Sequence, residues 1–333
     1  MEQKTVLVTG VSGYIGHHCA LELLKEGYHV RGTLRSLSKG SHIVSSLKEF
    51  DEKSETIEFF EADLLDDAGW EEAMKDCDYV LHVASPFIMG EPTHPDILIK
   101  PAVEGTKRVL SYARKAGVKR VVLTSSTVAV SSDMESGVGT PSDWADPDKV
   151  GSYAKSKILA ERAAWDFIEG QEGDDKMEMV VINPGGVMGP TLTGTLTGTS
   201  VSMIHDMIQG KMPMIPDIAV GMVDVRDVAK VHVKAISVEE AVGQRFLLAS
   251  TEAIPMLRLA QILKDNGYDK VSTRKAPGFL LKIMALFNKD VKGMVSFLGR
   301  KVGCDNTSTK EVLDWKPTDI ETSIIDMAES ISK

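Results

Sequence analysis

Short apolar runs alternate along the chain with longer segments whose apolar positions repeat at helical spacing. The apolar runs have the length and residue types of buried strands. They predict strands near 5–9, 29–34, 57–61, 79–84, 120–125, 179–183 and 246–249. Helical patterns lie between them, including Leu98 to Ala116 and Tyr153 to Glu169. This alternation predicts an α/β protein with a doubly wound parallel sheet and right-handed crossovers.

The chain of 333 residues is long for one compact unit. We expect a first part over residues 1–190 that carries the sheet, and a smaller part over 191–333 that closes over it and binds substrate. Segments near 221–231 and 245–250 have the pattern of elements that return to the first part. The boundary is therefore expected to be discontinuous.

A glycine-rich turn follows the first predicted strand, where Gly10, Gly13 and Gly16 come at intervals of three. Such a turn uses glycine because a side chain would keep the backbone away from a pyrophosphate. The next helix ends at Gly27 and carries one apolar face, formed by Ile15, Cys19, Ala20, Leu23 and Leu24. Its N-terminus offers N–H groups to an anion, which predicts a Rossmann-type NAD(P) site. The alternative is a glycine-rich turn without a ligand.

The end of the second strand bears on which dinucleotide binds. A free ribose 2′-hydroxyl is usually held by an acid at this position, whereas this chain has Leu34 and Arg35 there. A guanidinium matches a 2′-phosphate in charge and geometry. We therefore predict NADPH in preference to NADH, with Lys39 as a second basic residue nearby. The alternative is a solvated surface arginine.

Tyr153 and Lys157 are four residues apart in a segment of helical pattern, which puts both side chains on one face. A free tyrosine titrates near ~10, but a neighbouring ammonium and an oxidised nicotinamide favour the phenolate. Tyr153 is therefore a candidate acid–base group. The fifth strand ends in Thr124, Ser125 and Ser126, at the edge where parallel sheets bind ligands. A serine there is a candidate to hold a substrate oxygen beside Tyr153, with simple turn chemistry as the alternative.

Motifs along most of the chain resemble the extended short-chain dehydrogenase/reductase superfamily. They are the Thr9-Gly-x-x-Gly-x-x-Gly16 turn, Ala62-Asp-Leu64, His82-Val-Ala-Ser-Pro86, the Tyr153/Lys157 pair, Asn183-Pro-Gly185, Val223-Asp-Val-Arg-Asp-Val-Ala229 and Asp314-Trp-Lys-Pro317. Arg35, the segment 82–86 and the segment 99–106 make the chain similar to dihydroflavonol 4-reductases and to NADPH-dependent aldehyde, ketone or methylglyoxal reductases. The 3β-hydroxysteroid dehydrogenases are a more distant likeness.

The resemblance implies roles for individual residues. The catalytic set is Ser126, Tyr153 and Lys157, and the family motif favours Ser126 over its neighbour Ser125. Cofactor contacts are implied for Gly10, Ser12, Gly13, Tyr14, Ile15, Gly16, Arg35, Asp63, Leu64, Val83, Ala84, Ser85, Thr124, Tyr153, Lys157, Pro184 and Gly185. Substrate contacts are expected at Phe87, Met89, Ser126, Tyr153 and Met222.

The activity implied is NADPH-dependent reduction of an aldehyde or ketone to an alcohol. One alternative is an NAD-dependent nucleotide-sugar epimerase or dehydratase, or an enzyme like the 3β-hydroxysteroid dehydrogenases. Many extended members carry an asparagine before the Gly-Thr pair at residues 105–106, whereas this chain has Lys100-Pro-Ala-Val-Glu104. That difference and Arg35 argue against the epimerase. A non-catalytic redox sensor is disfavoured because all three catalytic residues are intact.

Composition narrows the partners and the location. The net charge is −10 and no basic stripe stands out, so nucleic acid is not expected to bind. Cys19, Cys77 and Cys304 lie far apart without the spacing of metal ligands, so no metal is predicted. No apolar run has the length of a membrane span, and the chain begins without the pattern of a signal peptide. We expect a cytoplasmic protein, either monomer or homodimer.

Two further segments have open interpretations. Residues 189–200 are rich in glycine and threonine, which is typical either of a mobile lid over the substrate or of a plain surface loop. Residues 279–287 predict an amphipathic helix without a strong basic face. We expect that helix to pack on the substrate-binding part or on a partner copy.

Overall fold

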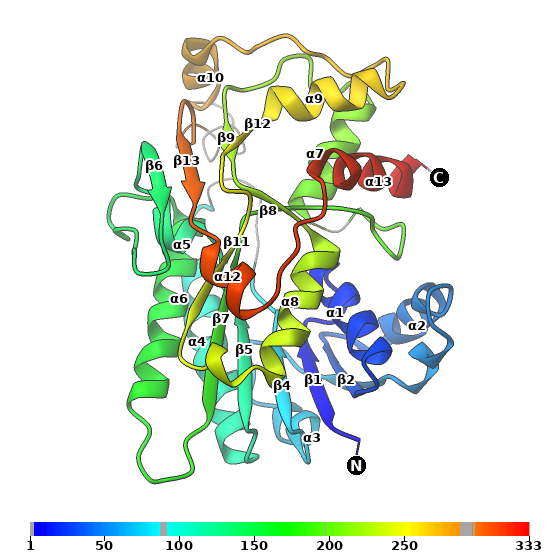
Figure 1. Cartoon of the computed structure of the whole chain (residues 1–333), viewed down its shortest axis with the longest axis vertical. Coiled ribbons are helices and arrows are strands. Elements are labelled where there is room, and N and C mark those ends of the chain that lie inside the picture. The colour runs from blue at the N-terminus through cyan, green and yellow to red at the C-terminus, as the bar shows by residue number, and fades with distance from the viewer. Residues whose placement is uncertain (1–2, 87–91, 197, 287–294, 296, 333) are drawn as a thin grey trace.

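A seven-stranded parallel sheet forms the centre of the molecule (Figure 1). The structure, a computed structural model, describes residues 3–86, 92–196, 198–286, 295 and 297–332. The strand order is β11-β7-β5-β4-β1-β2-β3. The strands are β1 (Thr5–Thr9), β2 (His29–Leu34), β3 (Glu58–Glu61), β4 (Tyr79–His82), β5 (Arg120–Thr124), β7 (Glu178–Pro184) and β11 (Arg245–Leu248). Every predicted strand is present to within two residues at each end, which confirms the doubly wound α/β fold.

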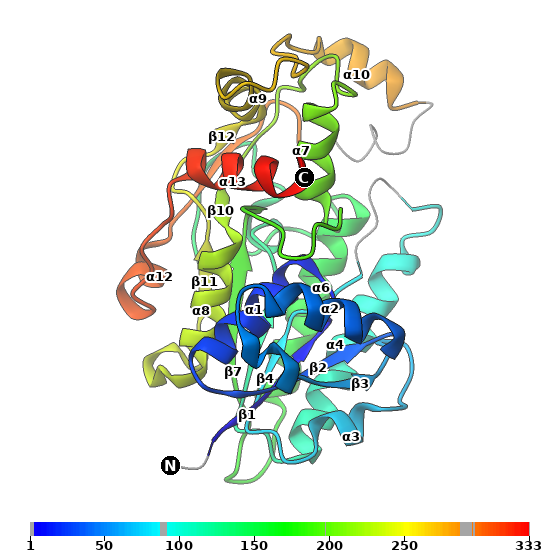
Figure 2. The ribbon, with the colours of Figure 1, turned by 90° about the vertical axis from the view of Figure 1, so that its right-hand side faces the viewer.

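Helices cover both faces of the sheet. The helices of this part are α1 (Tyr14–Lys25), α2 (Gly40–Lys48), α3 (Trp70–Met74), α4 (Asp96–Lys115), α5 (Val128–Ser131), α6 (Ser152–Glu169) and α8 (Val225–Ser237). Helices α1 and α8 pack together on one face, and α4 and α6 pack together on the other. Figure 2 shows α2 and α3 beside the β2–β3 edge. Short turns of 3₁₀ helix lie at Leu37–Lys39, Glu52–Thr56 and Glu239–Ala241.

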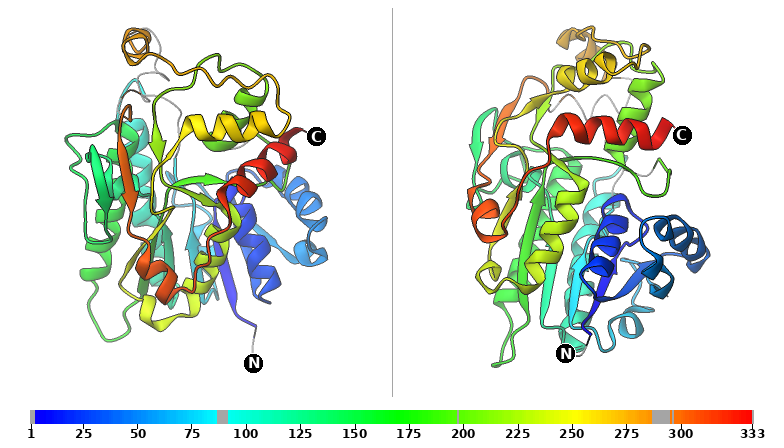
Figure 3. Two further views of the ribbon diagram at one scale, coloured as in Figure 1. Left: turned by 45° about the horizontal axis from the view of Figure 1, so that its top comes forward. Right: turned by 45° about the vertical axis from the view of Figure 1, so that its right-hand side comes forward.

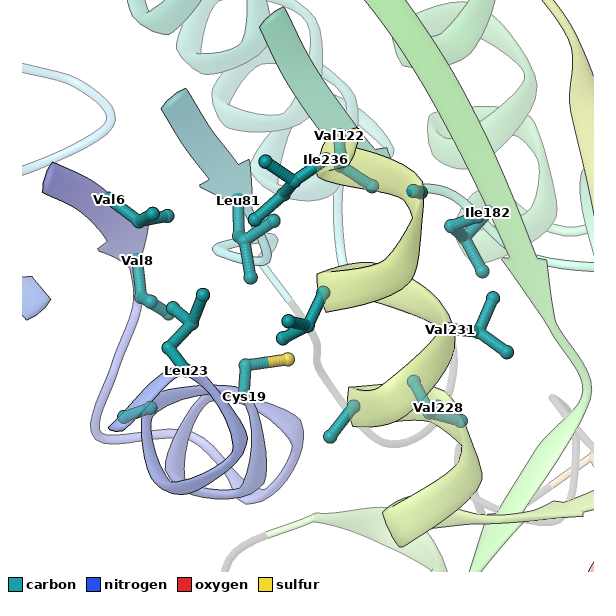
Figure 4. Packing of buried hydrophobic residues seen from close by; sticks show 14 of the residues in the cluster. Val6, Val8, Cys19, Leu23, Leu81, Val122, Ile182, Val228, Val231 and Ile236 are labelled. Carbon is teal, nitrogen blue, oxygen red and sulfur yellow. The ribbon is translucent and has the colours of Figure 1, made fainter. Parts of the chain in front are cut away.

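Alternate side chains of the central strands enter two different cores. Val6 and Val8 of β1 pack with α1 and α8, whereas Leu7 packs with α3 and α4. Figure 4 shows the first cluster, in which Cys19 and Leu23 of α1 lie opposite α8 and the strands. Because both faces are covered, the inner positions of the central strands are apolar without alternation, as in Val6-Leu-Val8 of β1 and Val121-Val-Leu123 of β5.

A buried arginine fixes the end of α8 against the sheet. Arg120, the first residue of β5, is fully buried. Its Nη1 donates to the carbonyls of Ala235, Ile236 and Val238 at 3.0, 2.8 and 2.8 Å. A cation at a helix C-terminus satisfies the last carbonyls and favours the helix dipole. Helix α8 is therefore part of the sheet-bearing body, although it follows residue 190.

A smaller part lies beyond the carboxyl ends of the strands (Figures 1 and 3). Its apolar core joins α7 (Thr199–Ile208), α9 (Met256–Asp265) and α13 (Ile320–Ser332). Pairs of short strands connect it to the rest: β8 (Gly186–Met188) with β10 (Met222–Asp224), β9 (Ala219–Val220) with β12 (Ile254–Pro255), and β6 (Ser136–Gly139) with β13 (Lys301–Cys304). Helix α12 (Thr307–Val312) lies beside β11. Strand β11 returns to the main sheet as expected, and the division near residue 190 stays a prediction.

The amphipathic helix expected at 279–287 corresponds to α10 (Gly278–Met284), and its last predicted residue lies outside the described residues. Phe279 is 70% exposed and Ile283 is 51% exposed. Among the described residues, nothing covers these two side chains, so packing of this face on the substrate-binding part stays a prediction. Packing on a partner copy stays a prediction.

Candidate active site

The glycine turn after β1 needs two of its glycines for its own packing. A Cβ at Gly10 would lie 2.9 Å from the Ala84 Cα, and Gly10 has a φ of +66°. A Cβ at Gly16 would lie only 2.4 Å from the Gly10 carbonyl oxygen. The tight turn and the close approach of β4 therefore exclude side chains at both positions.

Gly13 differs from the other two, because a Cβ there would meet only the Gly10 oxygen, at 3.2 Å. It is the N-cap of α1 and makes no side-chain cap hydrogen bond. The first N–H groups of a helix lack partners within the helix, and an anion at this end is stabilised by them and by the helix dipole. The turn has no side chain at Gly13 and has space beside that residue, so a dinucleotide pyrophosphate would fit there. Ser12 lies in the same turn and is partly buried.

Side chains of the first turn of α1 point away from that anion site. The Tyr14 hydroxyl donates to the Gly189 carbonyl at 2.6 Å, and Ile15 packs against the main core. His18 Nε2 lies 2.9 Å from the Pro190 carbonyl, so this nitrogen carries the proton. These bonds attach the start of the glycine- and threonine-rich segment to α1. Cofactor contacts from Tyr14 and Ile15 stay predictions, and their backbone N–H groups are the atoms left to make them.

Arg35 is solvent-exposed directly after β2, at the edge where the sheet order places the adenosine end of a dinucleotide. Asp63 follows β3, and its Oδ1 accepts the N–H of Leu65 at 2.8 Å in a local turn. Leu64 packs on α4, where a Cβ at Gly105 would lie 2.8 Å from the Leu64 Cβ. The predicted contacts of these residues with the cofactor remain predictions.

The segment after β4 crosses the sheet beside the glycine turn. The Ala84 N–H donates to Thr9 Oγ1 at 3.0 Å, and Thr9 Oγ1 lies 2.8 Å from His82 Nδ1. Burial, and secondarily the Lys157 charge, lowers the pKa of His82 to about 3, so this imidazole is neutral. Val83 and Ser85 are partly buried. The two substrate candidates that come next, Phe87 and Met89, lie outside the described residues.

The phenol of Tyr153 and the hydroxyl of Ser126 meet at the carboxyl edge of the sheet. Tyr153 is in the first turn of α6, Ser126 follows β5, and the two side chains are hydrogen-bonded. Burial raises the pKa of Tyr153 to about 12, and the bond with Ser126 opposes that rise. Burial thus outweighs the lowering that we expected from the lysine. Ser125 points elsewhere and donates to the Glu161 carboxylate at 2.5 Å, so only Ser126 stands beside the phenol.

Lys157 lies one helical turn after Tyr153 and is 7% exposed. Its ammonium donates to the Thr124 carbonyl at 3.5 Å. Burial lowers the pKa of Lys157 to about 8, and the charge of Glu161 limits that fall. The Thr124 hydroxyl lies 2.8 Å from His232 Nε2, while His232 Nδ1 lies 2.7 Å from the Val228 carbonyl. A carbonyl only accepts, so Nδ1 carries the proton and Nε2 accepts from Thr124.

One narrow cavity brings four of the predicted cofactor residues together: Ala84, Ser85, Thr124 and Lys157. Pro184 and Gly185 end β7 nearby, and the Pro184 carbonyl lies 3.4 Å from Ser126 Oγ. A Cβ at Gly185 would lie 2.3 Å from the Gly221 carbonyl oxygen, so glycine is required there. Met222 is 3% exposed within the core of the smaller part, so its predicted substrate contact would need that core to open.

Sequence reasoning missed the role of a buried ionic group behind the catalytic residues. Glu161 and Arg245 form an ion pair of 2.6 Å, and both side chains are buried. Asn183 Nδ2 donates to the same carboxylate at 2.8 Å and to the Ser126 carbonyl at 3.2 Å. The available signal was a charged residue inside an apolar pattern: Glu161 on the apolar stretch of its helix, and Arg245 at the start of an apolar strand.

Two further features of the described residues concern a metal site and a membrane span. Among them, no group of three or more His, Cys, Asp or Glu side chains is placed so that it could hold a metal ion. No helix among them is both long and apolar enough to cross a bilayer.

Several known proteins are similar to this chain in sequence. The model of the NAD dependent epimerase/dehydratase family matches residues 6–249. Cinnamoyl-CoA reductase 1 of Petunia hybrida is 37% identical over 258 residues, which are 74% of this chain and 73% of that protein. The NADPH-dependent methylglyoxal reductase of Saccharomyces cerevisiae is 30% identical over 351 residues, which are 99% of this chain and 98% of that protein.

Solved structures share the whole architecture. The yeast methylglyoxal/isovaleraldehyde reductase complexed with NADPH aligns with a TM-score of 0.80 and 28% identity, covering 98% of this chain and 98% of that chain. Vestitone reductase from alfalfa (Medicago sativa) aligns with a TM-score of 0.75 and 25% identity, covering 99% of this chain and 98% of that chain. The similarity therefore includes the smaller part as well as the sheet.

Proposed function

The chain belongs to the NAD dependent epimerase/dehydratase family, the extended short-chain dehydrogenase/reductases, and on that premise we propose that it reduces an aldehyde or ketone with NADPH. It lies in the branch that is similar to dihydroflavonol reductases, whose relatives here include cinnamoyl-CoA and methylglyoxal reductases. The observation that carries the proposal is the hydrogen bond between Tyr153 and Ser126, with Lys157 one turn further along α6.

Each catalytic residue has a role that follows from its position. When bound, NADPH supplies a hydride for the carbonyl carbon. Ser126 donates a hydrogen bond to the carbonyl oxygen and orients it beside the phenol. Tyr153 donates its proton to that oxygen as negative charge develops there. An alkoxide is a much stronger base than a phenolate, so a tyrosine that stays protonated at neutral pH is suited to act as the acid.

Lys157 assists through its charge. An ammonium beside the phenol stabilises the phenolate that remains after proton transfer, and this brings the pKa of Tyr153 down when the site works. Its Nζ is also the donor that we assign to the ribose hydroxyls of the nicotinamide nucleoside, because it faces the cavity lined by Ala84 and Ser85. Both roles need the protonated amine.

The preference for NADPH rests on Arg35. Its exposed guanidinium follows β2, where an acidic residue would select the 2′-hydroxyl of NADH. Charge-assisted hydrogen bonds from a guanidinium to a phosphate favour the phosphorylated ribose. Two relatives support this choice, since their names or titles state use or binding of NADPH.

A panel of carbonyl compounds tests the proposed reaction. Purified protein is mixed with NADPH or NADH and with methylglyoxal, isovaleraldehyde, a dihydroflavonol or cinnamoyl-CoA, and cofactor oxidation is followed by absorbance. We expect NADPH oxidation with at least one aldehyde or ketone and formation of the alcohol in equal amount. Tightly bound NAD that copurifies, with no oxidation of added NADPH, would instead favour the epimerase or dehydratase.

The substrate that we propose is a small-molecule carbonyl compound, in line with the names of the similar reductases. The cytosol remains the predicted compartment, in line with three cysteines that are all unpaired and buried. A monomer and a homodimer both remain predicted states of assembly.

A further inference from the structure

A single buried carboxylate stands directly behind the catalytic residues. Glu161 lies on α6 one turn after Lys157 and is 1% exposed. Its Oε2 accepts from Ser125 Oγ at 2.5 Å and from Asn183 Nδ2 at 2.8 Å. Its Oε1 accepts from Arg245 Nε at 2.6 Å. These hydrogen bonds and the ion pair with Arg245 compensate for the hydration that a carboxylate loses on burial.

The partners of Glu161 hold the backbone that carries Ser126. Ser125 is the preceding residue, and its N–H also donates to the Ile182 carbonyl at 2.8 Å. Asn183 donates to Glu161 and to the Ser126 carbonyl, at 2.8 and 3.2 Å. The end of β5 is therefore held through the side chain of Ser125 and through the backbone of Ser125 and Ser126. In this arrangement Ser126 Oγ faces Tyr153.

Arg245 fixes the carboxylate in turn. The guanidinium comes from β11 and is 8% exposed. Its Nη1 donates to the carbonyls of Pro141 and Asp143 at 2.8 and 2.7 Å, and it lies 3.9 Å from the centre of the Trp144 ring. The ion pair thus joins β11, α6 and the segment 141–144, and these contacts hold the carboxylate in place behind the site.

The charges around Lys157 single out Glu161. The groups near the ammonium are Glu161 on α6, the Thr124 carbonyl on β5 and His82 on β4, and Tyr153 lies one turn earlier on α6. The imidazole and the phenol are neutral at neutral pH, since their pKa values are about 3 and about 12. Glu161, which is paired with Arg245, is the acidic residue among these groups. A buried ammonium without a nearby anion gives up its proton, because the cost of desolvation then falls on the charged form.

We propose that Glu161, held by Arg245, is a positioning residue that supplies the counter-charge for the Lys157 ammonium and fixes the serine pair beside Tyr153. The inference rests on the proposed reduction, because that reaction needs Lys157 protonated and Ser126 aligned. Glu161 touches neither substrate nor cofactor in this account and acts through its neighbours.

The first test needs neither cofactor nor substrate. The lysine side chains are labelled with ¹³C at Cε, and Lys157 is titrated by NMR after assignment with Lys157→Met. In Glu161→Gln the pKa of Lys157 should fall by about one unit, because the opposite charge is lost while the shape is kept. Glu161→Gln leaves Arg245 buried without its partner and could unfold the protein. The double variant Glu161→Gln/Arg245→Met removes both charges, so the same titration can be made on a protein without an unpaired buried charge.

Trp165→Phe is the matched control. It removes a hydrogen bond of 3.4 Å from Trp165 Nε1 to Glu161 Oε1 and leaves every charge in place. The pKa of Lys157 should not change in this variant. A folded Glu161→Gln/Arg245→Met protein whose Lys157 titrates as in the wild type overturns the proposal, and so does an equal shift in Trp165→Phe.

The pH dependence of turnover is the second readout. The alkaline limb of kcat/KM should move to lower pH in Glu161→Gln by the same amount as the NMR shift. Glu161→Asp keeps the charge but shortens the side chain and so lengthens its contacts, and its limb should therefore stay in place while kcat falls. If Lys157 shifts in the NMR titration and yet the wild type reduces no carbonyl, the coupling is supported and the proposed reductase function alone is overturned.

Discussion

The two ends of the dinucleotide site are built in opposite ways. At the nicotinamide end, Lys157 and Glu161 are buried, and their hydrogen bonds and ion pairs run through the interior. At the adenosine end, Arg35 and Lys39 are exposed after β2. The first arrangement is completed by the protein itself, whereas we predict that the second presents its charge to the cofactor. On this prediction, buried residues fix the chemistry in advance and exposed residues set the choice of cofactor.

This contrast has an energetic consequence. Removing one partner from a buried charged network leaves another group unsatisfied, which destabilises the protein as well as the site. Removing an exposed charge changes stability by only a few tenths of a kcal/mol. Substitutions at the two ends should therefore differ in whether stability changes together with function.

Tyr153→Phe should have the largest effect on turnover. It removes the proton donor and one hydroxyl, and we expect kcat to fall by about 10²- to 10⁴-fold. The glycine turn and Arg35 are untouched, so binding of NADPH should stay within about threefold of the wild type. Steady-state kinetics and fluorescence titration with NADPH measure the two quantities. Turnover that survives the change would remove Tyr153 from the mechanism.

Gly16→Ala should affect the cofactor and stability together. The added Cβ would lie 2.4 Å from the Gly10 oxygen and 2.9 Å from the Val11 Cα, so the turn must move. We expect a loss of about 1–3 kcal/mol in the free energy of unfolding and at least tenfold weaker binding of NADPH. Gly27→Ala is a useful comparison, because it tests a helix end where a Cβ meets nothing within 4 Å although φ is +82°. It should cost stability without weakening NADPH binding.

Arg35→Ala should change cofactor choice alone. Loss of charge-assisted bonds to a phosphate is worth about 1.5–3 kcal/mol, so the KM for NADPH should rise by about 10- to 100-fold. The KM for NADH and the melting temperature should hardly change. Arg35→Lys separates charge from geometry and should lie between the two. An equal rise for both cofactors would show that the guanidinium does not meet the 2′-phosphate.

The effect least tied to turnover should be a gradual loss of stability in mild acid. Burial lowers the pKa of His82 to about 3, and those of His17, His18 and His232 to about 4. The unfolded chain takes up protons near the usual histidine value of about 6.5, before the folded protein does. Stability is therefore present above that value and falls as pH decreases toward 4. Melting curves between pH 7.5 and 4.5 test this, and His232→Gln should flatten the decline.

The fold could be predicted because its signals are local. The inner positions of the central strands form short apolar runs, and Gly10, Gly13 and Gly16 mark the turn by their spacing alone. The pairing of Tyr153 with Ser126 was also accessible, since parallel strands bring their carboxyl ends to one edge. Ser125 and Ser126 could not be separated from the residues alone. Their hydroxyls diverge because Glu161, 36 positions after Ser125, accepts from only one of them.

The network behind the site depends on contacts distant in sequence. Arg245 meets Glu161 across 84 positions and reaches the Pro141 carbonyl across 104, and no local pattern predicts such pairings. The pKa of Tyr153 was misjudged for a similar reason, because its burial depends on elements that only the folded chain assembles. The exposed face of α10 shows the converse, since an amphipathic pattern does not reveal what, if anything, covers it.

Transfer of deuterium from labelled cofactor tests the central claim most directly. The protein is given NADPH carrying deuterium at the transferable position, together with the best carbonyl compound from the panel. The alcohol is analysed by mass spectrometry for the wild type and for Tyr153→Phe. We predict one deuterium on the alcohol carbon for each wild-type turnover and almost no product from the variant. An alcohol that lacks the label, or equal product from both proteins, would contradict reduction at Tyr153.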